Sequence, residues 1–136
     1  MPHHRWTDLP LEPLSSTLER RYLSSSRMTL AQIFLKKGAT VPRHQHDNEQ
    51  IAYILSGRVC FWLGEGDEER VEVAEGEVLV IPPNVPHRAE ALEDSLDLDV
   101  FAPPRADWMS GDDAYLRGGQ AGEQRSGGAQ ETEGTA

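Results

Sequence analysis

Residues 38–57 read GATVPRHQHDNEQIAYILSG, a glycine-bounded stretch with two histidines one residue apart, His44 and His46. On an extended segment, residues i and i+2 point to the same face, so two imidazoles there can reach one metal ion at about 2.0–2.2 Å. Gln50, a polar residue four positions beyond His46, can supply a third ligand. The stretch therefore predicts a strand that carries metal ligands.

A second stretch supplies a fourth candidate ligand. Residues 76–87 read GEVLVIPPNVPH, and His87 closes this stretch. His87 falls on an expected strand that can lie beside the one carrying His44 and His46. The sequence thus predicts a metal site formed by His44, His46, Gln50 and His87.

The segment from 28 to 102 alternates apolar and polar residues, as half-buried strands do. Glycines at tight-turn positions separate the apolar runs, and no helical pattern of 10 to 15 residues interrupts them. An all-β fold, a single antiparallel β-barrel or jelly roll, is therefore favoured over a βαβ fold. The expected strands cover 28–35, 51–55, 58–63, 70–73, 78–82, 87–92 and 96–101.

The length of 136 residues is enough for one domain with its own core. We expect that domain at 28–117. Residues 1–27 carry scattered apolar positions and three prolines, which suggest an arm on the barrel with room for one helical turn. Residues 118–136 hold no large apolar residue and cannot offset the entropy of ordering, so a disordered tail is expected there.

The charge balance excludes some partner classes. A net charge of −10, with 13 scattered basic residues, argues against nucleic acid, which needs a clustered basic surface. The N-terminus lacks the apolar core of a signal peptide, and no apolar run approaches the length of a membrane-spanning helix. We therefore expect a cytoplasmic protein without membrane partners. His3 and His4, at the chain terminus, are interpreted as incidental rather than as a metal site.

The two stretches resemble the paired motifs of the cupin superfamily, Gly-x5-His-x-His-x(3,4)-Glu-x6-Gly and Gly-x5-Pro-x-Gly-x2-His-x3-Asn. The first motif matches at Gly38, His44, His46 and Gly57, and the second at Gly76, Pro82 and His87. Three positions depart from the pattern. Gln50 stands for the glutamate, Asn84 for the second glycine and Ala91 for the asparagine.

Glu49 competes with Gln50 for the third-ligand position. Strand alternation puts the two on opposite faces, so only one of them can bind the ion, and we favour Gln50 because it keeps the motif spacing. With a neutral amide as ligand, the occupied site has a net charge of +2 rather than the +1 that a glutamate would give. The ion is then a stronger Lewis acid but is held less tightly. The expected cofactor is one divalent ion, and zinc, iron, nickel, manganese and copper all suit such a site.

A further signature follows at 97–108, DLDVFAPPRADW, where Asp99 and Phe101 share one strand face and Arg105 comes soon after. This pattern resembles the pectin- and alginate-pathway cupins, which convert 4,5-unsaturated uronates to their linear, ketonised form. The resemblance implies that Asp99 is the acid/base, that Arg105 holds the substrate carboxylate and that Phe101 forms an apolar wall. From the residues alone, Phe101 also fits a core position, and Arg105 also fits a solvated turn or an ion pair with Asp99.

The function expected from the resemblance is isomerisation of a small sugar-acid substrate by ring opening and ketonisation. A cupin dioxygenase and a non-catalytic module that binds small molecules remain alternatives. The resemblance also implies a homodimer. Tyr53 and Trp62 lie on expected strands, where either could line the pocket or pack in the core.

Overall fold

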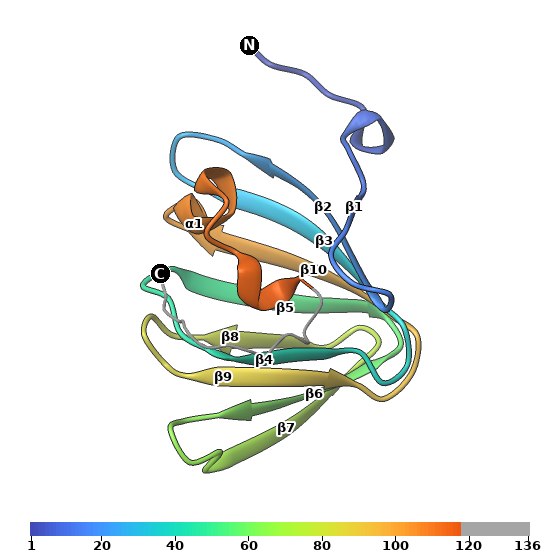
Figure 1. Ribbon diagram of the computed structural model, residues 1–136, viewed down its shortest axis with the longest axis vertical. Helices are drawn as coiled ribbons and strands as arrows, with labels where there is room; N and C mark the ends of the chain where they lie inside the picture. Colours follow the sequence, from blue (N-terminus) through green and yellow to red (C-terminus); the bar gives the residue numbers. More distant parts are fainter. Residues whose placement is uncertain (118–136) are drawn as a thin grey trace.

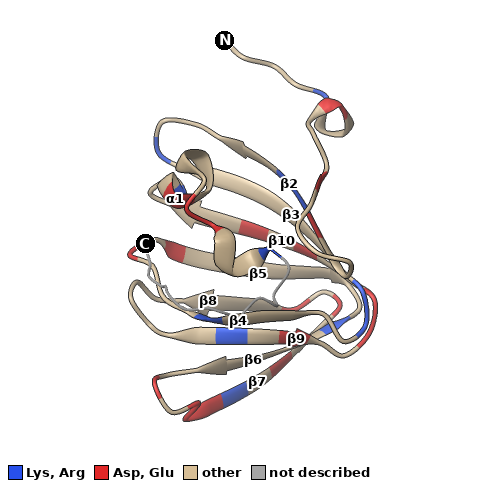
Figure 2. Ribbon diagram, viewed as in Figure 1, with Lys and Arg blue, Asp and Glu red and all other residues tan. Residues whose placement is uncertain are grey.

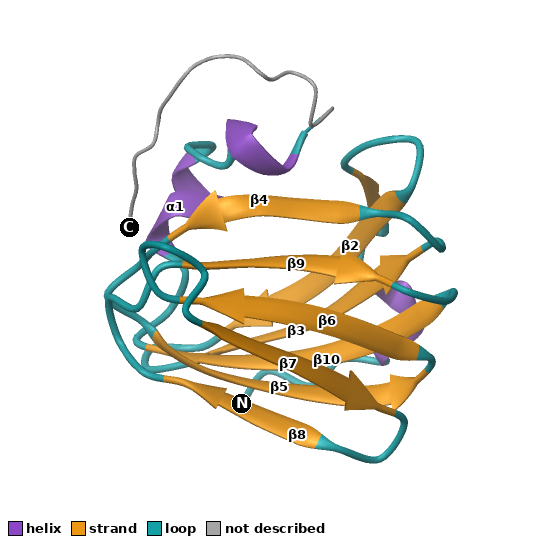
Figure 3. Cartoon of the chain, turned by 90° about the horizontal axis from the view of Figure 1, so that it is seen from below, coloured by secondary structure: helices purple, strands orange, loops and turns teal. Residues whose placement is uncertain are grey.

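The computed structural model describes residues 1–117 and places them in two antiparallel sheets packed face to face (Figure 1; Figure 3). The larger sheet has the order β1 (Glu12–Pro13), β2 (Leu18–Ser24), β3 (Thr29–Leu35), β10 (Ser95–Ala102), β5 (Glu49–Ser56) and β8 (Val78–Ile81). The smaller sheet has the order β4 (Thr40–His44), β9 (His87–Ala91), β6 (Arg58–Leu63) and β7 (Glu69–Ala74). The all-β jelly-roll architecture predicted from the sequence is confirmed. The tail expected at 118–136 lies outside the described residues.

The segment expected as an N-terminal arm contributes strands β1 and β2 to the larger sheet, and β2 pairs with β3 along its whole length. The alternation that marks a strand is hidden in β2 because the inward position between Leu18 and Tyr22 is a charged residue, Arg20. Arg20 is only 1% exposed. Its guanidinium lies 2.9 Å from a carboxylate oxygen of Glu12 and 2.9 Å from one of Asp113, and these ion pairs make burial of the charge possible.

Strand β10 lies between β3 and β5, at the centre of the larger sheet. Its side chains alternate, so that Asp97, Asp99 and Phe101 are buried toward the space between the sheets, while Leu98 and Val100 lie half-buried on the outer face. One side of that space is filled by an apolar cluster. Its buried members are Ala52, Ile54, Val59, Phe61, Leu63, Val73, Ile81 and Ala89.

The chain after β10 turns back over the open side of the sandwich (Figure 1; Figure 3). It forms the one-turn helix α1 (Ala106–Ser110) and the 3-10 turn η2 (Ala114–Leu116), and another 3-10 turn, η1 (Trp6–Asp8), precedes β1. Trp108 and Leu116 pack into a second apolar cluster with Leu14 and Leu18 from the N-terminal segment. Within residues 1–117, no helix has the length and apolar character needed to cross a membrane.

For Tyr53 and Trp62, the sequence left open whether each lines the pocket or packs in the core. In the structure they do neither. Tyr53 is 40% exposed on the outer face of β5. Trp62 is half-buried on β6 and stacks with arginines of the neighbouring strands: Cζ of Arg88 lies 3.8 Å from its ring centroid and Cζ of Arg70 lies 5.7 Å away. Figure 2 shows these basic positions of β9 and β7 among acidic ones on the smaller sheet, so opposite charges are interspersed there.

We expect the two glycines that bound the first motif to differ in their tolerance of alanine. Both have a left-handed backbone, with φ +88 at Gly38 and +90 at Gly57. A Cβ at Gly38 would meet nothing within 4 Å, whereas one at Gly57 would overlap the Ser95 hydroxyl and lie 2.7 Å from the Ser95 Cα. Gly57→Ala should therefore lower the free energy of unfolding by about 1–3 kcal/mol more than Gly38→Ala. Urea titration followed by circular dichroism measures this difference, and equal losses would contradict the prediction.

Candidate metal centre

Three histidines converge between the sheets. His44 ends β4, His87 begins β9 directly opposite it in the strand register, and His46 lies in the turn that leads to β5. Each offers a ring nitrogen, and these nitrogens all lie within 4.8 Å of one another. His46 and His87 are buried, and His44 is half-buried. The structure thus brings together the three histidines that the motif spacing predicted.

The three rings are held in the same tautomer by backbone carbonyls. Nδ1 of His44 lies 2.8 Å from the Pro42 carbonyl oxygen, and Nδ1 of His87 lies 2.8 Å from that of Val85. Nδ1 of His46 makes the same contact, at 3.0 Å, with the carbonyl of Asn48. Each carbonyl can only accept, so the proton sits on Nδ1 and the Nε2 lone pair is left free, as a metal ligand requires.

The Nε2 atoms of His46 and His87 are buried and have no hydrogen-bond partner within residues 1–117. Buried polar atoms are normally paired, so two orphaned nitrogens in one cluster fit a bound cation. Burial lowers the pKa of His44 well below its usual value, that of His46 to about 3 and that of His87 to about 4. The imidazoles are therefore neutral at pH 7, and their lone pairs are available to a metal ion.

Gln50 and Glu49 occupy opposite faces of β5, as strand alternation predicted. Gln50 is 6% exposed and lines the same pocket as His44 and His87. Glu49 is exposed on the outer face. Of the two residues, only Gln50 can therefore direct its side-chain oxygen toward an ion held by the histidines.

The pocket also contains two buried carboxylates on β10. Asp99 is 5% exposed, and its Oδ1 atom has no hydrogen-bond partner within residues 1–117. The same holds for Asp97, which is 6% exposed. Burial raises the pKa of Asp99 to about 6, although the neighbouring Asp97 and Gln50 and the charge of Arg105 oppose this shift. Burial and the charge of Asp99 raise the pKa of Asp97 well above its usual value. Asp97 was not predicted as a site residue, although it shares the strand face of Asp99 and Phe101.

Phe101 and Arg105 both line the pocket. The ring of Phe101 meets that of His46 edge-on, with centroids 5.7 Å apart, and Cζ of Arg105 lies 4.6 Å from the Phe101 centroid. Arg105 is 2% exposed, so it is not a solvated turn residue. Its ion-pair partner is Asp107 rather than Asp99: Nε and Nη2 donate to the two Asp107 carboxylate oxygens at 2.9 and 2.7 Å.

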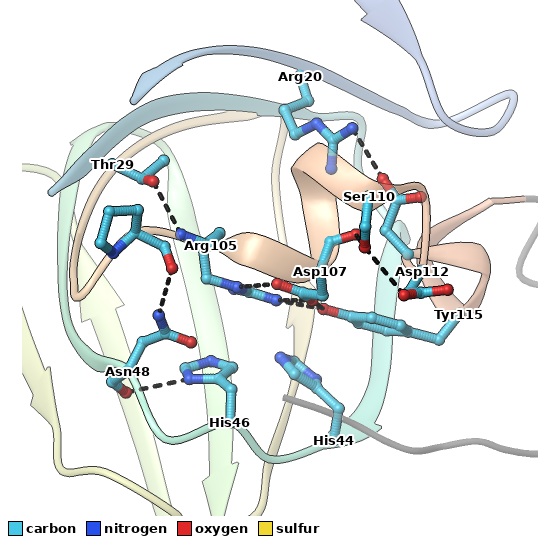
Figure 4. A network of polar contacts seen from close by, with 12 residues as sticks. Arg20, Thr29, His44, His46, Asn48, Arg105, Asp107, Ser110, Asp112 and Tyr115 are labelled. Carbon is cyan, nitrogen blue, oxygen red and sulfur yellow. Dashed lines mark hydrogen bonds and ion pairs between the residues drawn. The ribbon is translucent and has the colours of Figure 1, made fainter. Parts of the chain in front are cut away.

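Residues that the sequence analysis did not single out hold this arrangement in place (Figure 4). The Asn48 side chain donates to the carbonyls of Pro103 and Pro104 at 2.6 and 3.1 Å, which ties the histidine loop to the segment after β10. The Tyr115 hydroxyl lies 2.5 Å from Nη2 of Arg105. Burial raises the pKa of Tyr115, so the hydroxyl stays protonated. The sequence carried a local signal only for Asn48, which lies within the metal motif.

The pocket encloses about 580 Å³ of empty space, counting the part open to solvent. Its polar lining comes from His44, His87, Gln50, Asp97, Asp99, Arg105 and Tyr115. Its remaining lining is mostly aliphatic and aromatic. One pocket therefore combines a candidate cation site, a buried guanidinium and two buried carboxyl groups, each with one oxygen that has no partner within residues 1–117.

Comparison with known sequences agrees with this geometry. The sequence profile of the Cupin_2 family, described as a cupin domain, matches residues 32–102. The chain belongs to this family. Cupins commonly bind a divalent metal ion, and the three-histidine cluster of this cupin is where such an ion could be held.

Individual relatives are more distant. An uncharacterized protein of Methanocaldococcus jannaschii, MJ1618, is 37% identical over 65 residues, which are 47% of this chain and 50% of the relative, so the chain spans about half the length of that protein. The structure of KdgF from Halomonas sp. is 28% identical, covers 75% of this chain and 94% of its own, and superposes with a TM-score of 0.67. An RmlC-like cupin from Shewanella frigidimarina, 24% identical, covers 77% of this chain and 93% of its own with a TM-score of 0.70, and is similar in fold.

We expect zinc to bind at one ion per chain and to raise the melting temperature of the metal-free protein. At a zinc concentration about 100 times the dissociation constant, binding adds about 2.7 kcal/mol to the free energy of unfolding. His87→Ala should abolish this gain, because the ion loses one of its three imidazoles. The matched control is His3→Ala combined with His4→Ala, outside the cluster. Metal analysis and thermal melting provide the readout, and an undiminished zinc response in His87→Ala would refute the assignment.

Proposed function

We propose that this cupin catalyses ring opening and ketonisation of a 4-deoxy-4,5-unsaturated uronate. The observation that carries the proposal is the placement of Asp99 in the same pocket as Arg105 and two histidines of the cluster, His44 and His87. One carboxylate oxygen of Asp99 has no hydrogen-bond partner within residues 1–117. The resemblance of the Asp99, Phe101 and Arg105 pattern to the uronate-converting cupins supports it. The 28% identity to KdgF over nearly all of that chain is a second support.

The reaction is an isomerisation and needs no co-reactant. The anomeric hydroxyl loses its proton as an aldehyde forms, and the bond between the anomeric carbon and the ring oxygen breaks. The ring oxygen leaves as an enolate, and a proton then adds to C4, the alkene carbon farther from the carboxylate. A divalent ion in the histidine cluster would supply positive charge beside the enolate oxygen.

Asp99 is the group proposed to move the proton. As a carboxylate it accepts the proton of the anomeric hydroxyl through its free oxygen, and as the acid it returns that proton to C4. One residue can do both because the two positions lie on the same small ring. The buried site keeps bulk water away from the enolate, and the Phe101 ring forms part of that apolar wall.

Arg105 is proposed to hold the substrate carboxylate, though not by the bidentate contact that the resemblance suggested. Its Nε and Nη2 atoms are already paired with Asp107. Nη1 has no hydrogen-bond partner within residues 1–117 and is the atom left for a ligand. Its charge also offsets, inside the pocket, the repulsion that a chain of net charge −10 exerts on an anionic sugar.

Asp99→Asn should reduce the rate of ketonisation by about 10²–10⁴-fold, because the amide cannot shuttle the proton. Zinc content and melting temperature should stay close to those of the wild type. Loss of the alkene absorbance of an unsaturated uronate, corrected for the spontaneous reaction, measures the rate. Asp94→Asn, in an exposed turn, is the control and should keep full activity.

Full activity in Asp99→Asn would remove Asp99 from the mechanism. A wild-type protein that holds metal, leaves the uronate absorbance unchanged and consumes oxygen with an organic substrate would instead favour the dioxygenase alternative.

We also propose that the protein forms a homodimer through the outer face of the larger sheet. Paired side chains line this face in two rows across β3, β10, β5 and β8, and neither row holds a charged residue. Two copies that each carry −10 repel least across an uncharged surface, and a gently twisted sheet face can pack on itself about a two-fold axis. The rows are Leu30, Val100, Ile51 and Val80, and Gln32, Leu98, Tyr53 and Val78.

Light scattering should give a dimer mass for the wild type and a monomer mass for Ile51→Lys combined with Val80→Lys. The two lysines would place adjacent charges in the apolar row, where desolvation is costly. Met109→Lys changes an equally exposed apolar residue (54%) outside this face and should leave the dimer intact. A wild-type monomer at micromolar concentration would contradict the proposal.

A further inference from the structure

Tyr115 belongs to a segment that lies outside the cupin-family match, which ends at residue 102. It comes from the 3-10 turn η2, after the chain has turned back over the open side of the sandwich. The ring of Tyr115 packs against that of His44, with centroids 4.9 Å apart and planes tilted by 32°. His44 is the half-buried histidine of the cluster, and Tyr115 packs against it from the closing segment.

The Tyr115 hydroxyl meets the buried guanidinium beside the histidines (Figure 4). Nη2 of Arg105 donates to this oxygen at 2.5 Å. The hydroxyl proton has only a long contact in return, 3.4 Å to Oδ2 of Asp107. Oδ2 already accepts a hydrogen bond from Arg105 at 2.7 Å. The proton of Tyr115 is therefore weakly engaged within the protein and can be given to a ligand.

The position of η2 is fixed by contacts that do not involve the Tyr115 hydroxyl. Asp113, which precedes η2, is 1% exposed and pairs with Arg20 at 2.9 Å. Leu116 is buried in the apolar cluster. These anchors hold the turn independently of the Tyr115 hydroxyl, so the hydroxyl is not required to fasten the segment.

We propose that Tyr115 is a further ligand-binding residue of the histidine site. Its hydroxyl, held by Nη2 of Arg105, donates a hydrogen bond to the carboxylate of the substrate, next to the bond from Nη1 of the same guanidinium. The two donors replace the bidentate arginine contact that the pairing with Asp107 prevents. This inference rests on the proposed function, because it assumes an anionic sugar in the pocket.

The test uses D-galacturonate, a saturated uronate that the enzyme cannot convert, and the full-length protein loaded with zinc. Isothermal titration calorimetry gives the dissociation constant for the wild type, Tyr115→Phe and Tyr53→Phe. Tyr53→Phe is the matched control, because it removes the same hydroxyl from the outer face of β5, outside the pocket, and keeps the aromatic ring in the proposed dimer face. Tyr115→Phe should weaken binding about tenfold or more, the loss expected for one hydrogen bond to a charged group. Zinc stoichiometry and melting temperature should not change.

Equal affinities for the wild type and Tyr115→Phe would overturn the role of Tyr115 and leave the proposed function standing. Loss of zinc or a large drop in melting temperature in Tyr115→Phe would also overturn it, by showing that the hydroxyl supports the fold. A zinc-loaded wild type that binds no galacturonate would overturn both this inference and the uronate proposal.

Discussion

The pocket depends on the burial of one permanent charge, that of Arg105. At 2% exposure the guanidinium cannot be hydrated, and an unpaired charge there would cost several kcal/mol. The chain after β10 meets this requirement with Asp107, two residues further on, whose carboxylate accepts hydrogen bonds from Nε and Nη2. Trp108 stacks on the guanidinium, with Cζ 4.5 Å from its ring centroid. The first turn of the segment that closes the sandwich, at Asp107 and Trp108, is thus organised around Arg105.

A second buried guanidinium, that of Arg20 on β2, is paired and stacked in the same way. Cζ of Arg20 lies 4.5 Å from the ring of Trp108, the same ring that Arg105 contacts, and Arg20 pairs with Asp113. The aromatic ring therefore contacts two cations, each neutralised by an acid of the C-terminal segment. The contact of Trp108 with Arg20 therefore holds strand β2 against the closing segment. It links residues far apart in the sequence without any strand pairing between them.

The sequence predicted the features that depend on local spacing, such as the face of a strand on which a side chain lies. His44, His87 and Gln50 line one pocket because strand alternation and motif spacing fix the direction of their side chains, and Glu49 is excluded for the same reason. Strand β2 was missed because Arg20 occupies an inward position where the pattern requires an apolar residue. The pairing of Arg105 could not be read from its neighbours alone: Asp99 and Asp107 are both near it in sequence, and only the backbone turn after β10 decides that its Nε–Nη2 edge faces Asp107.

The distribution of unsatisfied polar atoms argues that this pocket was shaped for a ligand rather than for stability. Within residues 1–117, the buried side-chain atoms without a partner include Nε2 of His46 and His87 and Oδ1 of Asp97 and Asp99. Each such atom costs about 1–3 kcal/mol if nothing compensates it. A barrel selected only for stability could replace these side chains by apolar ones of similar size, as it does on the opposite side of the sandwich around Ile54 and Ile81. Two imidazole nitrogens of the histidine cluster and two carboxylate oxygens of β10 thus have no partner within residues 1–117. A cation and a proton-bearing substrate would satisfy them together, so the atoms that cost stability here are the ones expected to do the chemistry.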